Sequence, residues 1–272
     1  MTRDAHVHLE ATARLERGMT EGPTGPGGTL SRVLADCARA LALGGASTAF
    51  VRFNPVRWAE RGVSAAQQRQ DLVRASGYAL DSFNVELAFF VSLKRDGESS
   101  NWGSAVEFAL AGQDRHVLGV DLSRSYDVAD PFSVPGPDGP AAELSRQLRR
   151  ARDGGLVIAV HCGWHEGRVD IEEALSVGAT RIGHGVPLCQ APDLEADVAA
   201  GGVVVEVCPT AFERRTGESV ASLPLDRWLD AGIVIDVGSD HPIALGTSIS
   251  SERTRLARSF PRWATSTSNA SA

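Results

Sequence analysis

Eight short apolar runs, each the size of one strand, recur along the 272-residue chain. They cover residues 4–8, 47–53, 85–93, 117–122, 156–160, 181–185, 203–207 and 233–237. Segments that suit helices lie between them, at 31–43, 65–78, 102–110, 141–152, 171–177, 192–200 and 225–229. Near-continuous Val, Ile and Leu runs are typical of parallel strands buried on both faces. Eight β/α units in about 240 residues predict an α/β fold, a (β/α)8 TIM barrel. A doubly wound open sheet is the second alternative, and no strand is followed by a GxGxxG loop.

The composition predicts one globular domain over residues 1–262 and a disordered tail over residues 263–272, which are rich in Ser, Thr, Ala and Asn. The chain has 27 Lys and Arg against 34 Asp and Glu, a formal charge of −7. This charge argues against nucleic acid or an anionic membrane as a partner and leaves a small-molecule substrate.

No apolar run reaches the roughly 18 residues that a membrane span needs, and no apolar leader precedes the first strand. The four cysteines lack CxxC spacing. We therefore expect reduced thiols and a cytoplasmic protein, with the oligomeric state left open.

Six of the seven histidines lie at or just beyond the C-terminal ends of predicted strands, and His116 is the exception. Histidines scattered at random would not favour one end. The active sites of TIM barrels lie at this end. His6 and His8 are two residues apart on one strand, so both side chains point to the same face. The same end also carries Arg52, Lys94, Asp121, Arg124, Cys208 and Asp240.

Three of these histidines and one aspartate suit a mononuclear metal site built from His6, His8, His161 and Asp240. Imidazole and carboxylate ligands favour Zn²⁺, with Fe²⁺, Ni²⁺ or Co²⁺ as alternatives. A bound metal ion lowers the pKa of its water toward about 7. His184 then orients the resulting hydroxide or takes its proton.

Each of these positions also has a structural interpretation. The first pair of histidines can be a chance HxH, His161 a core histidine, and Asp240 a helix N-cap before Pro242. For His241 a structural role or a substrate contact is favoured over metal ligation, because neighbouring residues on a strand face opposite sides.

Five short motifs follow one another between residue 4 and about residue 245. His6-Val7-His8-Leu9-Glu10 is close to HxHLDG, and residues 161–163 are close to the start of HAGE. Residues 181–185 are identical to RIGHG, residues 205–210 are like EVCPxS, and residues 239–242 are like TDDP. In these motifs the chain resembles the adenosine deaminase branch of the amidohydrolase superfamily. The resemblance implies a TIM-barrel, metal-dependent hydrolase whose zinc ligands are His6, His8, His161 and Asp240. It also implies that His184 stands beside the metal-bound water.

The chain departs from this family at the positions that contact the purine. The Glu of HAGE is replaced by Trp164, and Glu166 follows two residues later. The second Asp of TDDP is replaced by His241, the Asp of HLDG by Glu10, and a purine-contacting glycine by Arg124. We also expect the lid after the first strand and the C-terminal extension to be reduced relative to this family.

These departures predict an altered substrate. Tryptophan cannot transfer a proton at neutral pH, and loss of a general acid typically costs 10²–10⁴-fold in rate. We therefore expect deaminase-type hydrolysis, with ammonia release, of a non-standard nucleoside or small heterocycle, including anionic ones. His184, Asp240 and Glu166 are the predicted catalytic residues. The predicted substrate-binding residues are Trp164, Arg124, His241, Glu10, Arg52 and Lys94.

Two other functions remain open. One is a hydrolase of a cyclic amide, lactone or ester that releases no ammonia. The other is a non-catalytic, adenosine deaminase-like binding protein. The three basic residues Arg52, Lys94 and Arg124 also have an alternative to anion binding, because they can form salt bridges with Asp96, Asp121 and Asp127.

Overall fold

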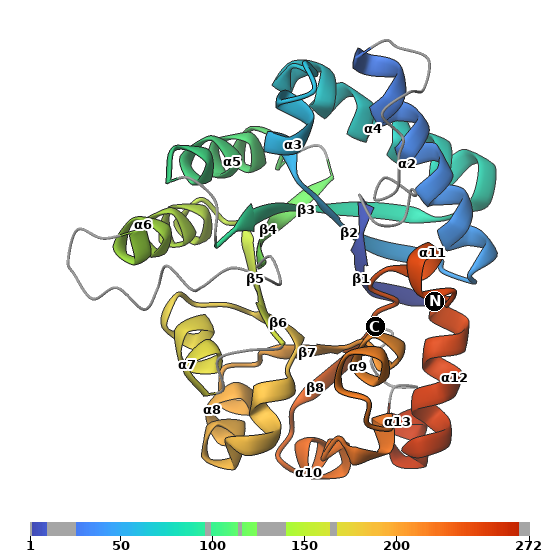
Figure 1. The fold of residues 1–272 in the computed structure, drawn as a ribbon, viewed down its shortest axis with the longest axis vertical. Coiled ribbons are helices and arrows are strands. Elements are labelled where there is room, and N and C mark those ends of the chain that lie inside the picture. The colour runs from blue at the N-terminus through green and yellow to red at the C-terminus, as the bar shows by residue number, and fades with distance from the viewer. Residues whose placement is uncertain are drawn as a thin grey trace.

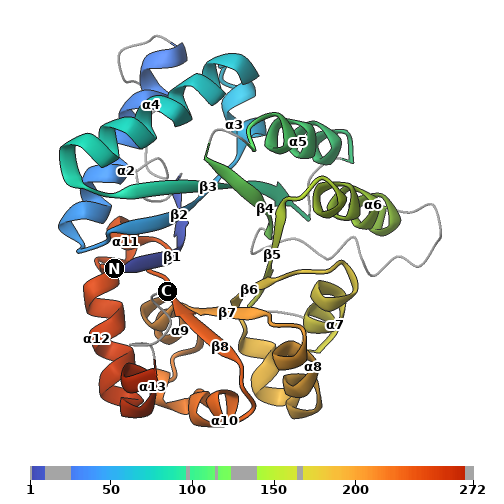
Figure 2. The ribbon, with the colours of Figure 1, turned by 180° about the vertical axis from the view of Figure 1, so that it is seen from behind.

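The computed structural model describes residues 2–9, 26–95, 99–113, 116–123, 140–163 and 168–266. Eight parallel strands form one sheet in the order β1 to β8. Figures 1 and 2 show these strands at the centre and the helices outside them. The strands are β1 (Arg3–His8), β2 (Thr48–Phe53), β3 (Glu86–Lys94), β4 (Val117–Ser123), β5 (Val157–Cys162), β6 (Arg181–His184), β7 (Val204–Val207) and β8 (Val234–Val237). The predicted (β/α)8 TIM barrel is confirmed.

Seven helices lie where the sequence predicts them, in the segments between the predicted strands. They are α2 (Pro26–Leu43), α4 (Ala65–Phe83), α5 (Ser99–Ala111), α6 (Pro140–Asp153), α7 (Arg168–Ser176), α8 (Glu195–Ala200) and α10 (Leu225–Asp230). The 3₁₀ turn η3 (Pro192–Leu194) leads into α8, and η2 (Val186–Gln190) and η4 (Val220–Ser222) are two more such turns.

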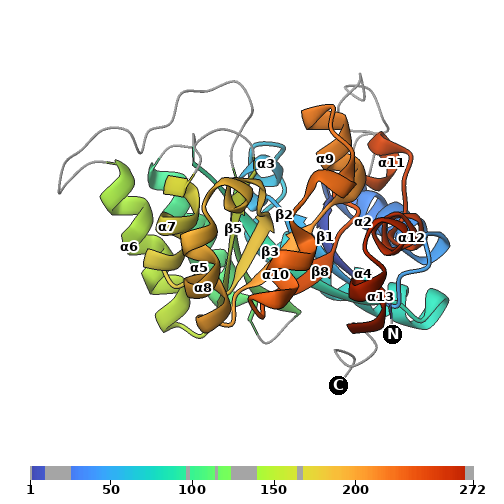
Figure 3. The same ribbon diagram turned by 90° about the horizontal axis from the view of Figure 1, so that it is seen from below.

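Five helices were not predicted. They are α3 (Pro55–Ala59), α9 (Pro209–Thr216), α11 (Pro242–Leu245), α12 (Ile249–Ser259) and α13 (Pro261–Ser266). Four of them begin with proline, whose fixed φ suits the first helical position, but they are too short for a clear periodic pattern. Seen from the side, α3, α9 and α11 lie on the same side of the barrel (Figure 3). These short helices therefore follow the strand ends where the predicted site lies.

Helix α13 runs past residue 262, where the sequence predicts the start of the tail. Residues 263–266 continue helix α13, and Trp263 in this helix is buried. An indole placed among other apolar side chains favours order over fraying. The remaining tail residues, 267–272, lie outside the described residues. Among the helices that the structure describes, none is long and apolar enough to cross a membrane.

The barrel closes where β1 meets the segment after β8. The Asp240 backbone N–H donates to the His6 carbonyl at 2.7 Å, and the His8 N–H donates to the Asp240 carbonyl at 2.9 Å. Gly238 permits this approach, since a Cβ there would lie 2.3 Å from the Cβ of His6. The buried Asp4 carboxylate accepts hydrogen bonds from the Ser239 N–H at 2.9 Å and from its hydroxyl at 2.5 Å. The closure of the barrel and the predicted metal site therefore share the same residues.

Candidate metal centre

Three histidines and an aspartate converge at the C-terminal end of the barrel. His6 Nε2 lies 3.2 Å from His8 Nε2, which lies 3.0 Å from His161 Nε2. Asp240 Oδ1 lies 3.9 Å from His6 Nε2 and 3.5 Å from His8 Nε2. The structure thus brings together the four predicted ligands from β1, β5 and the end of β8.

The chemistry of this donor set fits a divalent transition-metal ion. Bonds of about 2.0–2.2 Å to one ion place its donor atoms roughly 3–4 Å apart, as these are. Asp240 is 3% exposed, yet its Oδ1 accepts no hydrogen bond from any residue that the structure describes. A buried carboxylate oxygen without a donor is costly unless a cation lies beside it.

A carboxylate behind His6 fixes which of its ring nitrogens faces the centre, and a second carboxylate lies close to His161 without a hydrogen bond to it. His6 Nδ1 donates to Glu206 Oε2 at 2.7 Å, which leaves the lone pair of Nε2 directed at the other donors. His161 Nδ1 lies 3.1 Å from Asp121 Oδ1. Burial is the largest influence on the pKa of His6 and lowers it well below its usual value, so its ring is neutral. A neutral ring with a fixed tautomer is the form that binds a metal ion.

Glu206 in turn lies between two buried guanidinium groups. Arg181 Nε donates to Glu206 Oε1 at 2.5 Å, and Arg52 Nη2 donates to Oε2. Burial raises the pKa of Glu206, but the positive charges of Arg52 and Arg181 outweigh it and hold this pKa below its usual value. Arg181 continues to Asp236 at 3.1 Å, and Asp236 meets Arg3 at 3.4 Å. A chain of charged pairs therefore runs from the metal centre through the barrel interior to the half-exposed Arg3.

The predicted role of Arg52 in substrate binding needs correction. Its side chain is fully buried, and its Nη1 donates to the carbonyl oxygens of Ala5 at 2.5 Å and Phe50 at 3.1 Å. Its Nε also lies 3.9 Å from Asp121 Oδ1. Arg52 is thus held beneath the metal centre and has no surface to offer a substrate. The salt-bridge alternative is the one that the structure supports for this residue.

His184 stands next to the three histidines predicted to be ligands, at the end of β6. Its ring centroid lies 5.0 Å from that of His6 and 5.4 Å from that of His161. Burial lowers its pKa to about 4, so the ring is neutral at pH 7 and has a nitrogen that can accept a proton. The preceding Gly183 leaves room for the centre, because a Cβ there would lie 2.9 Å from His6 Cε1.

Two residues of the centre have positive φ angles, +65° at His184 and +58° at Asp240. This left-handed conformation costs a residue with a side chain of order 1–3 kcal/mol and persists where the surrounding structure holds it. Such strain is often found at functional sites. Here it falls on two of the three residues predicted to be catalytic.

The reason for placing His241 away from the metal is wrong. Residues 238–241 lie beyond β8, and the left-handed turn at Asp240 ends the alternation of a strand. The side chains of Asp240 and His241 therefore both face the centre, and His241 Nε2 lies 3.1 Å from Asp240 Oδ1.

Of the other residues with predicted substrate or catalytic roles, the structure describes only Lys94 in this part of the site. Lys94 is half-buried at the end of β3, and its charge adds to the effect of burial, which is the main cause that lowers the pKa of His8. Glu10, Arg124, Trp164 and Glu166 lie outside the described residues, as do Asp96 and Asp127, so their predicted roles stay predictions.

A model of the family described as "Adenosine deaminase" matches residues 28–270. The chain belongs to the adenosine deaminase family. Adenosine deaminase from Vibrio parahaemolyticus is 32% identical over 143 residues, which cover 52% of this chain and 40% of that protein. Adenine deaminase from Aspergillus fumigatus is 34% identical over 110 residues, 40% of this chain and 31% of that protein. The matched region thus spans less than half the length of these curated relatives.

Solved structures of two deaminases and of an amidohydrolase share the fold. Adenine deaminase from Arthrobacter aurescens has a TM-score of 0.77 at 22% identity and covers 97% of this chain and 90% of its own. A zinc-bound amidohydrolase from Burkholderia ambifaria has a TM-score of 0.76 at 19% identity, with 95% and 79% covered. The N6-methyl-AMP deaminase from Arabidopsis thaliana has a TM-score of 0.73 at 18% identity, with 96% and 86% covered.

The sequence did not predict the positioning roles of Glu206, Arg181 and Asp4. Glu206 accepts a hydrogen bond from His6 and is itself paired with Arg181. Asp4 accepts hydrogen bonds from Ser239, the residue before Asp240. The signal was present as single charges inside apolar runs, as in Val203-Val204-Val205-Glu206-Val207. A charge in a strand with both faces buried must find a partner inside the barrel. Which partner it finds depends on how the eight strands are staggered.

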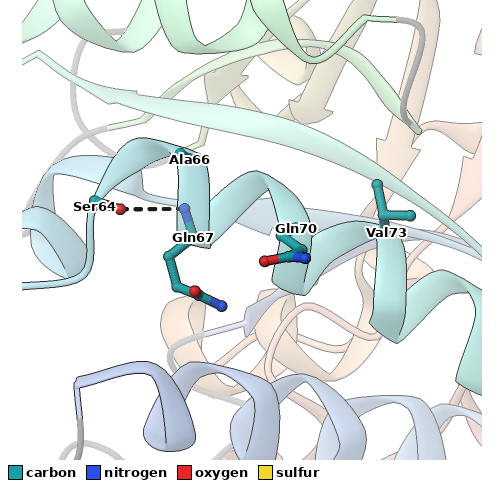
Figure 4. Close-up of a pocket in the computed structure, with 5 residues that line it drawn as sticks. All are labelled: Ser64, Ala66, Gln67, Gln70 and Val73. Carbon is teal, nitrogen blue, oxygen red and sulfur yellow. Dashed lines mark hydrogen bonds between the residues drawn. The ribbon is translucent and has the colours of Figure 1, made fainter.

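A separate hollow lies on the outside of the barrel. Figure 4 shows its lining, which consists of residues on or next to the N-terminal half of α4, namely Ser64, Ala66, Gln67, Gln70 and Val73. No histidine or carboxylate of the metal centre lines it. We therefore place the functional site at the strand ends.

Proposed function

We propose that the protein is a zinc-dependent hydrolase with deaminase-type chemistry on a non-standard nucleoside or small heterocycle, including anionic ones. The observation that carries this proposal is the convergence of His6, His8, His161 and Asp240 beside the neutral, buried His184. Zinc is supported by the imidazole-rich donor set and by the zinc-bound amidohydrolase of the same fold. Fe²⁺, Ni²⁺ and Co²⁺ are alternatives.

The roles of the residues follow from their positions. A divalent ion at this centre supplies a water molecule whose pKa is lowered toward about 7. His184 accepts a proton at its ring nitrogen and holds the nucleophile against an amidine-like or imine-like carbon of the substrate. Burial of these groups excludes bulk water, which strengthens the electrostatic interactions between them. Ammonia leaves once a proton reaches the leaving nitrogen, a step that we assign to Glu166.

The substrate proposal has two supports. Two solved Arabidopsis structures of this fold are complexes with IMP and with GMP, small anionic nucleotides. In this chain the pKa of His8 is lowered mainly by burial and, to a lesser degree, by the charge of the half-buried Lys94 at the end of β3, which we propose as the positive charge for a phosphate or carboxylate. We therefore place the anionic group of the substrate at the β3 side of the centre.

A substrate screen tests this function. The metal-loaded protein is incubated with purine nucleosides and nucleotides, N6-substituted purines, pterins, cyclic amides and lactones, and the release of ammonia or amine is measured beside the release of protons. Ammonia or amine from one heterocycle supports the proposal, and proton release alone indicates the cyclic amide, lactone or ester alternative. An absence of turnover at full metal occupancy would favour a binding protein.

Two variants tie any turnover to the centre. We expect His184→Ala and Asp240→Asn each to lower the rate at least about 100-fold. His116→Ala is the matched control, because His116 is an exposed histidine just before β4, away from the strand ends of the centre. Turnover like that of the unmodified protein in either variant contradicts the assignment.

A further inference from the structure

His241 presents its imidazole to the metal centre. Its Nε2 lies 3.1 Å from Asp240 Oδ1, and its ring lies beside that of His8, with centroids 4.8 Å apart and planes inclined by 12°. The ligand atoms of His8, Asp240 and His241 all lie within 4.8 Å of one another. The side chain is 24% exposed, so it stands at the rim of the centre.

The contact between His241 and Asp240 does not have the geometry of a hydrogen bond. Asp240 Oδ1 is buried and accepts no hydrogen bond from the described residues, although a ring nitrogen is only 3.1 Å away. A buried carboxylate oxygen that accepts no hydrogen bond is costly unless a cation lies beside it. A cation bound by Asp240 Oδ1 and by the nearby ring nitrogen of His241 would satisfy both atoms.

The backbone fixes this arrangement. The left-handed conformation of Asp240 turns the chain, and Pro242 starts helix α11 directly after His241. The backbone hydrogen bonds of Asp240 to His6 and His8 tie the turn to β1. His241 is therefore held at the centre by the same hydrogen bonds that hold the ligand Asp240.

We propose that His241 Nε2 is a further ligand of the ion held by His6, His8, His161 and Asp240. The inference rests on the metal centre of the proposed function and adds a fifth protein donor to it. Five donors and one substrate or water position suit ions that accept five or six ligands. This shell favours Fe²⁺, Co²⁺ or Ni²⁺ relative to a four-ligand shell, which suits zinc best.

Cobalt titration tests the proposal without any need for a substrate. The metal-free protein is titrated with Co²⁺, whose visible absorption becomes more intense as its coordination number falls. The unmodified protein is expected to bind one Co²⁺ per chain with a weak band. His241→Ala is expected to show a more intense band and an affinity lower by more than the roughly 10–100-fold that loss of an outer-shell partner costs.

Imidazole supplied in solution provides a second readout. It is expected to occupy the space vacated in His241→Ala and to restore the weak band. In the unmodified protein imidazole can only replace the water, so the band is expected to stay weak. His116→Ala is the control, with the spectrum and the affinity of the unmodified protein. The far-ultraviolet circular dichroism of each variant shows that the barrel remains folded.

Three outcomes overturn the inference. An unchanged spectrum and affinity in His241→Ala would show that the residue does not contact the ion. A weaker affinity with an unchanged spectrum would show that His241 only positions Asp240, and two Co²⁺ per chain would show that the residue belongs to a separate site. An unmodified protein that binds no Co²⁺ refutes the metal centre itself, so that failure is distinct from the others.

Discussion

Glu206→Gln is the substitution that most directly perturbs the support behind the metal centre. Glu206 is fully buried and accepts hydrogen bonds from His6, Arg52 and Arg181. Glutamine has nearly the same shape but no charge, and its amide nitrogen can only donate. The substitution therefore leaves two buried guanidinium groups without the carboxylate that neutralises them.

The magnitude follows from the burial of these partners. The Arg52 side chain is 0% exposed and that of Arg181 11%, so water cannot replace the lost carboxylate. Removing one partner of a buried ion pair costs about 3–5 kcal/mol of unfolding free energy. At roughly 2–4 °C per kcal/mol, the melting temperature is expected to fall by about 6–20 °C. Metal affinity is expected to fall about 10–100-fold, because glutamine keeps only one acceptor oxygen, for which His6 then competes with two guanidinium groups.

The assay is urea unfolding of the metal-free protein, followed by a metal titration of the folded variant. Glu172→Gln is the matched control, because Glu172 pairs with Arg168 while both side chains are about half exposed. An exposed pair contributes about 0–1 kcal/mol. A loss below about 1 kcal/mol in Glu206→Gln, similar to that in the control, would refute the view that this charged chain supports the centre.

Three further predictions concern other parts of the molecule. Gly183→Ala should lower metal affinity at least about 10-fold, because the added methyl group meets the His6 ring. Gly77→Ala is the control and should leave the affinity unchanged, because the space around Gly77 is open. Equal metal affinities of the two variants in isothermal titration would contradict this prediction. Burial raises the pKa of Glu252 above 4.5, so the native state holds its proton more tightly than the unfolded state, and this contribution to stability is lost as pH rises. Urea unfolding should therefore show Glu252→Gln gaining stability relative to the unmodified protein from pH 4 to pH 7, and a difference independent of pH would count against it. Asp4→Ala removes both acceptors of the Ser239 hydrogen bonds. It should lower the unfolding free energy by about 1–3 kcal/mol in the same assay. No loss of stability would show that this contact does not hold β1 to the segment after β8.

The sequence predicts the strands well because their signal is local. Val203 to Val207 and residues 233–237 are short apolar runs bounded by Gly or polar residues, and the structure has strands at Val204–Val207 and Val234–Val237. The position of a histidine at a strand end also follows from the chain alone. The barrel then brings these ends together, so the convergence of His6, His8 and His161 was predictable.

The pairing of the interior charges was not predictable in the same way. Arg52 on β2 and Glu206 on β7 are 154 residues apart, and they meet only because the staggering of the strands aims both side chains at one level of the barrel. The orientation of His241 depends on a single left-handed residue, Asp240, which no sequence pattern revealed. Both features arise from tertiary geometry that acts over a few ångströms.

The central claim is that this centre binds one divalent metal ion and that hydrolysis depends on it. The most direct measurement is metal content per chain, taken together with the release of ammonia or amine from the best substrate of the screen, before chelation, after chelation and after addition of Zn²⁺. We predict one ion per chain, loss of turnover on chelation and recovery with Zn²⁺. Undiminished turnover by the metal-free protein would contradict the claim.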